Sequence, residues 1–418
     1  MRTGHIKDIE QGYKYLGVLQ SYNNHDAEMR EKARTEYRKR VRQVLRSHLN
    51  GQNAMSAINT YAIPVIRYSA GIIAWPKEEM QQMDVKTRKL LTLHGALHPK
   101  SSSCRLYVCR KDGGRGLQSV EGTIKDEEAK MRSYCLERSE VDPILKECLR
   151  DWYQVQVVDL EDWRTKKLHG EYHRQIEKVA DIGMAYRWLT TSSLNTNTEA
   201  LIMAAQEQAL NTRSIQAGIY HTIQDGRYRL CKKATESVQH IVSGCSQLAS
   251  KAYTERHNQM ANIVHRAICN RYGLPQLTDW WEIPEKVVEN DQAKVLWDFY
   301  LHTDKQVIAN RPDIVVVDKI NRTTTIIDIA VPSDFNIKVK EIEKVEKYQA
   351  LREELERTWR TTAVVVPVVV GALGAVTPNC TQWLAQIPGE IEVHWLQKSA
   401  LLGTGKILRR FLKLPGFW

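Results

Sequence analysis

The 418-residue sequence lacks an apolar run long enough to cross a membrane. A spanning helix needs about 20 apolar residues. The longest apolar run, Ala363 to Val376, is shorter and is interrupted by Pro367, Gly371 and Gly374. The first residues include no apolar segment typical of a secretory signal, and no internal repeat or low-complexity tract is visible. The sequence therefore favours a folded protein without a membrane span.

Cysteine is also sparse, with eight residues dispersed over the whole chain. This excludes a disulfide-rich scaffold and is typical of a reducing compartment, where clustered cysteines bind metal more often than they pair. Hydrophobic residues make up 42% and charged residues 26% of the chain, which is ordinary for folded proteins. The length predicts several domains.

The net charge of +11 is concentrated in one region. Between Arg30 and Arg115 the sequence has 18 Lys and Arg residues against 6 Asp and Glu, which leaves the remainder close to neutral. Strong helix formers predict one basic helix from about Ala27 to Leu49, ended by Asn50-Gly51. Such a helix attracts polyanions, of which nucleic-acid phosphate is the commonest. The alternative is a solvated charged face.

A loop-rich basic stretch, His98 to Val120, follows this helix after an apolar segment, and its Arg and Lys residues suit backbone phosphates. The candidate nucleic-acid-binding residues are Arg30, Arg34, Arg38, Lys39, Arg42, Arg46, Arg105, Arg110, Lys111 and Arg115.

The fold class changes along the chain. The N-terminal two-thirds is predicted to be mostly α-helical, and the last part to be an α/β domain with a mixed sheet. We expect a helix over Asp291–Ile308, strands over Asp313–Asp318 and Thr323–Val331, a charged helix over Lys338–Arg360, and a third strand in the apolar run that follows.

Two acidic residues in this last region carry the most specific chemistry. If Lys319–Arg322 is a four-residue turn, Asp313 lies opposite Asp328 across a hairpin, where Cβ atoms are about 4.5–5.5 Å apart and like charges repel. A hard divalent cation such as Mg²⁺, or Mn²⁺, relieves this repulsion. Lys344 and Lys347 lie three apart on the following helix and can supply positive charge. The alternative for each aspartate is an ordinary strand-edge or turn residue.

A second candidate metal site lies upstream. Cys231, His240 and Cys245 have the spacing of a CCHC zinc knuckle, but Tyr228 occupies the position of the first ligand. Four N or S ligands satisfy tetrahedral zinc, and three leave the site open or weak. Two interpretations remain: a zinc site lacking one ligand, or a knuckle-shaped remnant held by packing.

The acid pair resembles the PD-(D/E)xK nuclease superfamily, with Pro312-Asp313 as the PD and Asp328 as the second acid. The usual lysine, two residues after the second acid, is replaced by Ala330. An additional acid is sometimes used in this superfamily, for which Asp298 and Asp304 are weak candidates.

The restriction-like endonuclease of site-specific non-LTR retrotransposons shows the same departure. Its R/K-P-D motif, with a second acid a dozen or so residues later, resembles Arg311, Asp313 and Asp328. The resemblance implies that Asp313 and Asp328 hold Mg²⁺ and that the lysine role falls on Lys344 or Lys347.

The order of segments also resembles the C-terminal part of such a reverse transcriptase/endonuclease protein. The implied parts are a palm-like remnant at residues 1–25, a basic thumb and template-binding region at 26–120, a helical linker at 121–225, a degenerate CCHC knuckle at 226–250, a restriction-like endonuclease at 285–400 and a basic C-terminal helix at 401–418.

The sequence contains no Asp-Asp pair, whereas polymerases of this class need a Y-x-D-D turn. Reverse transcription is therefore not expected from this chain, which resembles a truncated open reading frame. By resemblance, its activity is that of a hydrolase that nicks target DNA in the nucleus while the basic region binds template RNA or DNA. A non-catalytic nucleic-acid-binding remnant is the main alternative, and a resolvase-like nuclease for branched DNA is a third.

Overall fold

The computed structural model describes residues 13–15, 18–20, 25–142, 144, 162–276, 279 and 282–414. The chain divides into two compact units. The first comprises Met1–Asp162 with Asn195–Asn197, and the second Trp163–Leu194 with Thr198–Trp418. In these described ranges, no helix is both long and apolar enough to cross a membrane.

The first unit is mainly helical. The predicted basic helix is α1, which ends at Arg46 and buries Tyr37, Val41 and Val44 against its neighbours. Asn50 then caps the next helix, because its side chain accepts a hydrogen bond from the Asn53 N–H. The elements are β1 (Tyr13–Tyr15), β2 (Val18–Gln20), α1 (Asp26–Arg46), α2 (Gly51–Ala57), η2 (Ile58–Ala62), α3 (Ile63–Ser69), α4 (Lys77–Leu93), α5 (Ser103–Tyr107), η3 (Arg110–Asp112) and α6 (Val120–Ser139). Of the predicted palm-like remnant and helical linker, residues 1–12, 16–17, 21–24, 143 and 145–161 lie outside the described residues.

The second unit begins with short helices and continues into the α/β part. Its helix α11 is buried on every side from Thr198 onward, so it forms the centre of the helical portion. The helical elements are η4 (Trp163–Thr165), α8 (Glu171–Ile176), α9 (Ile182–Ala185), α10 (Trp188–Thr191), α11 (Thr196–Gln206), α12 (Arg213–Gly218), η5 (His240–Gly244), α13 (Ser246–Leu248), η6 (Ala249–Tyr253) and α14 (Thr254–Tyr272).

A mixed sheet follows, as the sequence predicts, but it has five strands rather than the three expected, in the order β3-β4-β5-β6-β7. Neighbouring strands are antiparallel except β6 and β7, which are parallel. Two helices connect β6 to β7, as a parallel connection requires. The elements are β3 (Val287–Glu289), β4 (Ala293–Trp297), β5 (Ile314–Asp318), β6 (Thr323–Ala330), α15 (Ile337–Lys347), α16 (Gln349–Trp359) and β7 (Thr362–Val369).

The helix predicted over Asp291–Ile308 is wrong. Ala293–Trp297 forms β4, which pairs with β3 on one side and β5 on the other. The Asn290 side chain accepts the N–H groups of Gln292 and Ala293 and so closes the β3–β4 turn. Pairing on both edges outweighs the local helix preference of this segment.

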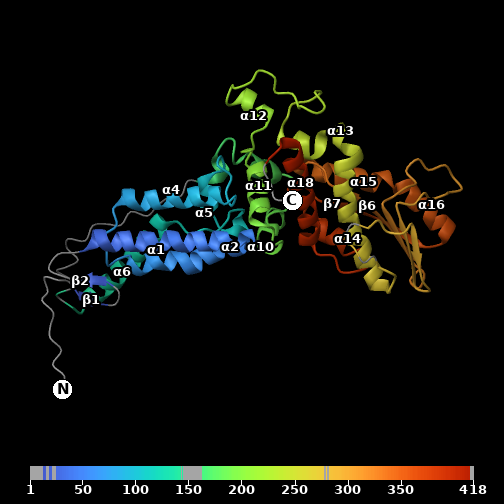
Figure 1. Ribbon diagram of the computed structural model, residues 1–418. Coiled ribbons are helices and arrows are strands. Elements are labelled where there is room, and N and C mark those ends of the chain that lie inside the picture. The colour runs from blue at the N-terminus through green and yellow to red at the C-terminus, as the bar shows by residue number, and fades with distance from the viewer. Residues whose placement is uncertain are drawn as a thin grey trace. The chain divides into compact units, whose positions relative to one another are not determined.

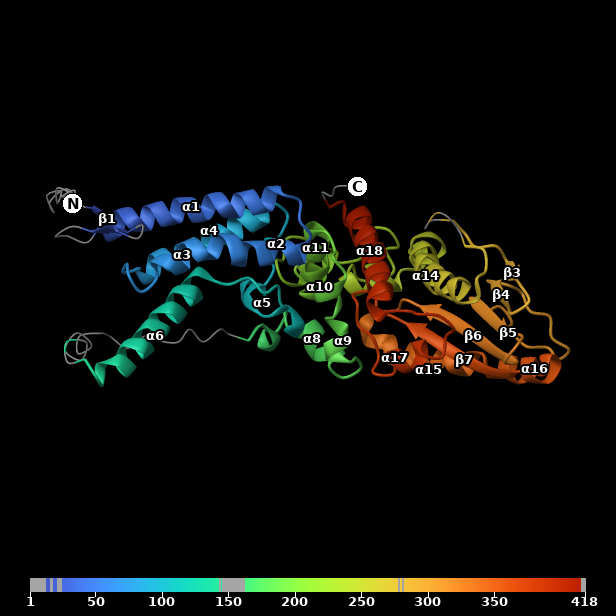
Figure 2. The same cartoon turned by 90° about the horizontal axis from the view of Figure 1, so that it is seen from below.

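Helices cover both faces of the sheet (Figure 1, Figure 2). On one face, α14 and α18 (Val393–Leu412) pack against the side chains that include Ile314, Ile327 and Val366. On the other, α15 and α16 contribute Tyr348, Leu351 and Leu355 to a core with Val315 and Ile326. The basic helix predicted at 401–418 is the second half of α18, and residues 415–418 lie outside the described residues.

Candidate functional site

The β5–β6 hairpin has the register that the sequence predicts. Ile314 pairs with Ile327 and Val315 with Ile326, and the turn occupies residues 319–322. Asp313 therefore immediately precedes β5, whereas Asp328 lies inside β6. The hairpin brings both carboxylates to the same end of the strand pair.

The Asp313 carboxylate is held by two donors. Its Oδ2 accepts the backbone N–H of Ile329 at 2.6 Å and lies 3.1 Å from Nε2 of His257. Because both contacts use Oδ2, they fix the carboxylate against β6 and leave Oδ1 as the other oxygen for a ligand. The main-chain oxygen of Asp313 accepts the Asp298 N–H.

His257 belongs to α14 and links that helix to the acid pair. Burial alone would lower the pKa of His257, but its hydrogen bond to Asp313, the Asp313 charge, the contact with Asn258 and the Asp328 charge together raise the pKa to about 9. The imidazole is therefore cationic at neutral pH, with Nε2 directed at Asp313 and Nδ1 lying 3.0 Å from Oδ1 of Asn258.

Asp328 is almost fully buried, with 3% of its side chain exposed. The ammonium group of Lys344 contacts its Oδ2, and the Lys347 Nζ lies 3.7 Å from its Oδ1. The Lys344 ammonium thus occupies the buried Oδ2 of this carboxylate. The structure thus brings Asp328 and both candidate lysines together, with Lys344 the closer and less exposed of the two.

Tyr348 separates α15 from α16 and completes the cluster. Its hydroxyl accepts a hydrogen bond from Lys347 at 2.8 Å and donates one to the Arg311 carbonyl at 3.2 Å. Burial and the charges of Asp328 and Asp313 hold the pKa of Tyr348 well above its ordinary value, so the phenol stays neutral. We call Asp313, Asp328, Lys344, Lys347, Tyr348 and His257 the acid cluster.

The two weaker acid candidates have other partners. Asp298 forms ion pairs with Arg311 at 2.6 Å and Lys286 at 2.9 Å. Asp304 is exposed and pairs with Arg357 on α16 at 2.8 Å. Asp298 thus positions the arginine that precedes the Pro312-Asp313 pair and touches the acid cluster through its backbone N–H, whereas its carboxylate and that of Asp304 have these other partners.

The predicted phosphate-binding residues of the first unit fall into two groups. Arg105 and Arg115 are 1% and 2% exposed and bind the backbone oxygens of Gly113 and Ala96. Their assignment as phosphate contacts was wrong, because buried guanidinium groups that organise the loop cannot reach a ligand. Arg110 lies in the same loop and donates to the Arg115 carbonyl at 3.2 Å, and Lys111 lies beside it.

The predicted residues on α1 also differ in orientation. Arg30 and Arg34 both pair with Glu79 on α4, at 3.3 and 3.1 Å. The exposed side of the helix instead presents Lys39, Arg42 and Arg46, while Arg38 is half-buried. No partner for Arg42 or Arg46 is found among the described residues, whereas Lys39 pairs with Glu36. We call Lys39, Arg42 and Arg46 the α1 basic face.

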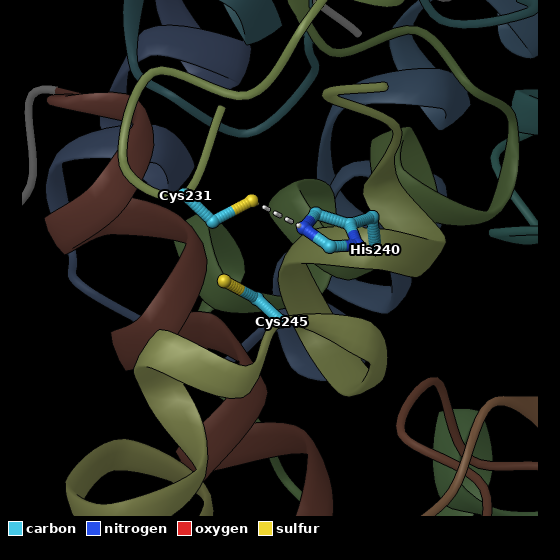
Figure 3. Close-up of side chains that lie close together, drawn as sticks. All are labelled: Cys231, His240 and Cys245. Carbon is cyan, nitrogen blue, oxygen red and sulfur yellow. Dashed lines mark hydrogen bonds between the residues drawn. The ribbon is translucent and has the colours of Figure 1, made fainter. Parts of the chain in front are cut away.

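The cysteine–histidine residues also converge (Figure 3). One ligand atom from each of Cys231, His240 and Cys245 lies within 4.8 Å of the others, and the Cys231 Sγ is 3.2 Å from the His240 Nε2. Burial opposes ionisation, but the N–H groups of Lys233 and Ala234 and the Cys245 thiol lower the pKa of Cys231. In the described ranges this is the one cluster of three or more such ligands.

Tyr228 packs against this cluster where a fourth ligand is missing. Its ring meets that of His240 edge to face, with centroids 5.4 Å apart. The hydroxyl is buried and has no hydrogen-bond partner among the described residues. Burial and the neighbouring Cys245 raise the pKa of Tyr228 well above its ordinary value. A neutral phenol is a weaker zinc ligand than a thiolate.

No protein-family model and no curated protein matches the chain.

His257 was missed in the sequence analysis. It precedes Asp313 by 56 positions and lies in a helix that contains no recognisable motif spacing to the acids. The one local signal is the polar run Arg256-His257-Asn258 in an otherwise amphipathic helix. In the structure Arg256 is buried and binds the Val331 carbonyl and the Thr404 hydroxyl.

The raised pKa of His257 predicts a pH-dependent stability in metal-free protein. The cationic His257 beside Asp313 stabilises the folded state fully below about pH 6.5. This contribution to the free energy of unfolding is lost as the pH rises through about 9. From about pH 6.5 to 9, the free energy of unfolding should therefore fall in the wild-type protein. In His257→Gln it should fall by roughly 1–3 kcal/mol less. Urea denaturation in EDTA at several pH values measures it. Identical pH profiles for both proteins would contradict the assignment.

Proposed function

We propose that the chain is a metal-dependent DNA endonuclease, and that its α/β part has the restriction-endonuclease-like fold. The observation that carries the proposal is the buried Asp328 carboxylate with two lysines against it and Asp313 at the end of the neighbouring strand. Such a group of acids and lysines in one location is typical of phosphodiester hydrolysis, which needs both a cation and a mobile positive charge.

The donor set fits a hard divalent cation. Mg²⁺ prefers carboxylate oxygens and is usually held by one or two of them together with substrate phosphate. Asp313 is held at Oδ2 by His257 and the Ile329 N–H, which leaves its Oδ1 for a cation, and Asp328 adds a buried carboxylate beside Lys344 and Lys347. Mg²⁺ or Mn²⁺, when bound by these two residues, polarises the phosphate and lowers the pKa of an attacking water.

The protein supplies orientation and charge. His257 and the Ile329 N–H hold the Asp313 carboxylate in place. Lys344 provides a nearly buried ammonium at Asp328, where it can neutralise charge on the phosphate. Lys347 is more exposed and hydrogen-bonds to Tyr348, so its role is to position that hydroxyl and to add positive charge.

A nicking assay on supercoiled plasmid with Mg²⁺ tests the proposal. Asp313→Ala and Asp328→Asn should reduce cleavage to background, and Lys344→Met should reduce it by about 10²–10³-fold, as the loss of one stabilising donor does. Lys347→Met should be affected less. Lys340→Met, on the same helix but paired with Glu343, is the matched control and should cleave normally.

A larger loss of cleavage in Lys344→Met than in Lys347→Met would identify Lys344 as the lysine that acts on the phosphate. A wild-type level of cleavage by Asp313→Ala would exclude the assignment. If the wild-type chain binds DNA but cleaves no linear, supercoiled or four-way-junction substrate, the non-catalytic binding protein is the better description. Preferential cleavage of the junction would favour the resolvase-like alternative. Circular dichroism confirms that each variant is folded.

We also propose that the α1 basic face binds template RNA or target DNA. Arg42 and Arg46 are exposed, lie four residues apart on one side of the helix and have no partner among the described residues. Unpaired guanidinium groups in this arrangement neutralise backbone phosphates without reading sequence. In agreement with the resemblance, we propose that these contacts serve a non-LTR retrotransposon protein acting in the nucleus.

Counterion release gives this second proposal a quantitative test. Arg42→Ala/Arg46→Ala should weaken duplex binding and reduce the slope of log K against log salt by about 1.8, since each phosphate contact contributes about 0.9. Lys130→Ala/Arg138→Ala on α6 removes the same charge elsewhere in the first unit and should leave the slope unchanged. If both double variants show the same slope of log K against log salt, the phosphate contacts do not lie on the α1 basic face.

The three converging ligands favour zinc as a further cofactor. We propose that Cys231, His240 and Cys245 hold Zn²⁺ weakly, because Tyr228 provides no thiolate in the fourth position. Bound zinc would tie the residue 228–232 turn to η5 and so stabilise this small segment.

Restoring the fourth ligand tests the zinc proposal. Tyr228→Cys should raise zinc affinity at least about tenfold, since even outer-shell partners are worth 10–100-fold. Cys231→Ser should lower the zinc affinity of both the wild-type protein and Tyr228→Cys. Cys104→Ser, outside the cluster, is the control. Competition with a chromophoric chelator measures the affinities. Zinc bound by neither wild type nor Tyr228→Cys would favour the remnant held by packing.

A further inference from the structure

The helices α14 and α18 pack against the same face of the sheet (Figure 2). Side chains of these two helices line a groove. It consists of hollows of about 810 and 540 Å³ that share Ile263, Arg266 and Trp395. A shallow hollow of only about 20 Å³ adjoins it and shares Gln259 and Lys406 with the second. At 1.5 Å per residue, the stretch of α14 that lines the two larger hollows, Gln259 to Arg271, is about 18 Å long.

Basic side chains predominate along this groove. Its lining includes Arg266, Arg271, Lys398, Lys406 and Arg410, against the acidic residues Glu255 and Glu390. Lys406 forms an ion pair with Glu255, and Arg266 donates to the Asp279 carbonyl. No partner for Lys398 or Arg271 is found among the described residues. The groove therefore has an excess of positive charge along its length.

The groove also presents apolar and aromatic surface between these cations. Trp395 is 42% exposed and borders both larger hollows, and Leu402, about two helical turns further along α18, is 45% exposed. Phe411 lines the far end, where the Arg410 guanidinium lies 5.4 Å from the ring centre. Exposed apolar surface that is rimmed by polar side chains is typical of ligand-binding grooves.

We propose that this α14–α18 groove binds a single strand of nucleic acid, with a base stacked on Trp395 and phosphates paired with Lys398, Arg271 and Arg410. Sequence-tolerant binding of single strands combines a positively charged groove with aromatic stacking surfaces. A duplex keeps its bases stacked inside and cannot offer one to Trp395. The two larger hollows span about five nucleotides at a stacked spacing of about 3.4 Å.

This site goes beyond the proposed nuclease and the α1 basic face, because it shares no residue with either. It is carried by α14, the helix that also supplies His257 to the acid cluster. A strand held in the groove is thus bound by the element that contacts Asp313. The test below needs no metal, so it remains informative if the chain cleaves nothing.

Photo-crosslinking with the full chain in EDTA tests the proposal directly. The probe is an oligothymidylate of about ten nucleotides that carries 5-iodouracil, and peptide mass spectrometry maps the attachment. We expect crosslinks at Trp395 or Phe411. Trp395→Ala should weaken binding of the same oligonucleotide about 5- to 100-fold by fluorescence anisotropy, as loss of one stacked base does, and Trp395→Phe should retain most of it.

Charge reversal provides the second arm. Lys398→Glu/Arg410→Glu should abolish crosslinking in the groove, whereas Lys178→Glu/Lys251→Glu, an equal charge change on exposed residues outside it, should not. Crosslinks confined to the first unit, or equal loss in both double variants, would overturn the proposal. A polyglutamate peptide of equal charge that displaces the oligonucleotide would also overturn the proposal. The groove would then bind polyanions in general rather than nucleotides.

Discussion

The buried Asp328 carboxylate is the constraint on which the α/β part depends. A carboxylate in the interior of a sheet is costly unless a cation accompanies it, and removing one partner of a buried ion pair leaves an uncompensated charge. Here Asp328 lies within β6, pairs with Pro367 of β7, and has a side chain that is only 3% exposed. Lys344 must therefore face the sheet, which fixes the orientation of α15.

This requirement extends to both layers of helices. The break at Tyr348 lets α15 direct its lysines at Asp328 while α16 contributes Leu351 and Leu355 to the core behind it. On the opposite side, α14 reaches the same end of the hairpin through His257 and Asp313. The two helical layers thus meet at one charged cluster, and α14 presents its other side to the groove along α18. The helix α14 therefore contributes His257 to the proposed nuclease site and also lines the proposed binding groove.

The sequence predicted the parts of the site that depend on local pattern. The hairpin register followed from a four-residue turn between two β-branched runs, and the lysines from their spacing on one helix face. It did not predict β4, whose strand conformation comes from pairing on both edges, nor His257, whose contact with Asp313 requires the folded α14. Arg105 and Arg115 were assigned to phosphate because charge alone does not reveal that a guanidinium group is buried in its own loop.

The claim that Asp313 and Asp328 share one divalent cation is tested most directly by anomalous diffraction from crystals of the full chain grown with Mn²⁺. The account predicts an anomalous peak within coordination distance of both the Asp313 and the Asp328 carboxylates, at the end of the β5–β6 hairpin. Crystals saturated with Mn²⁺ that show no peak there, with Lys344 still against Asp328, would contradict it.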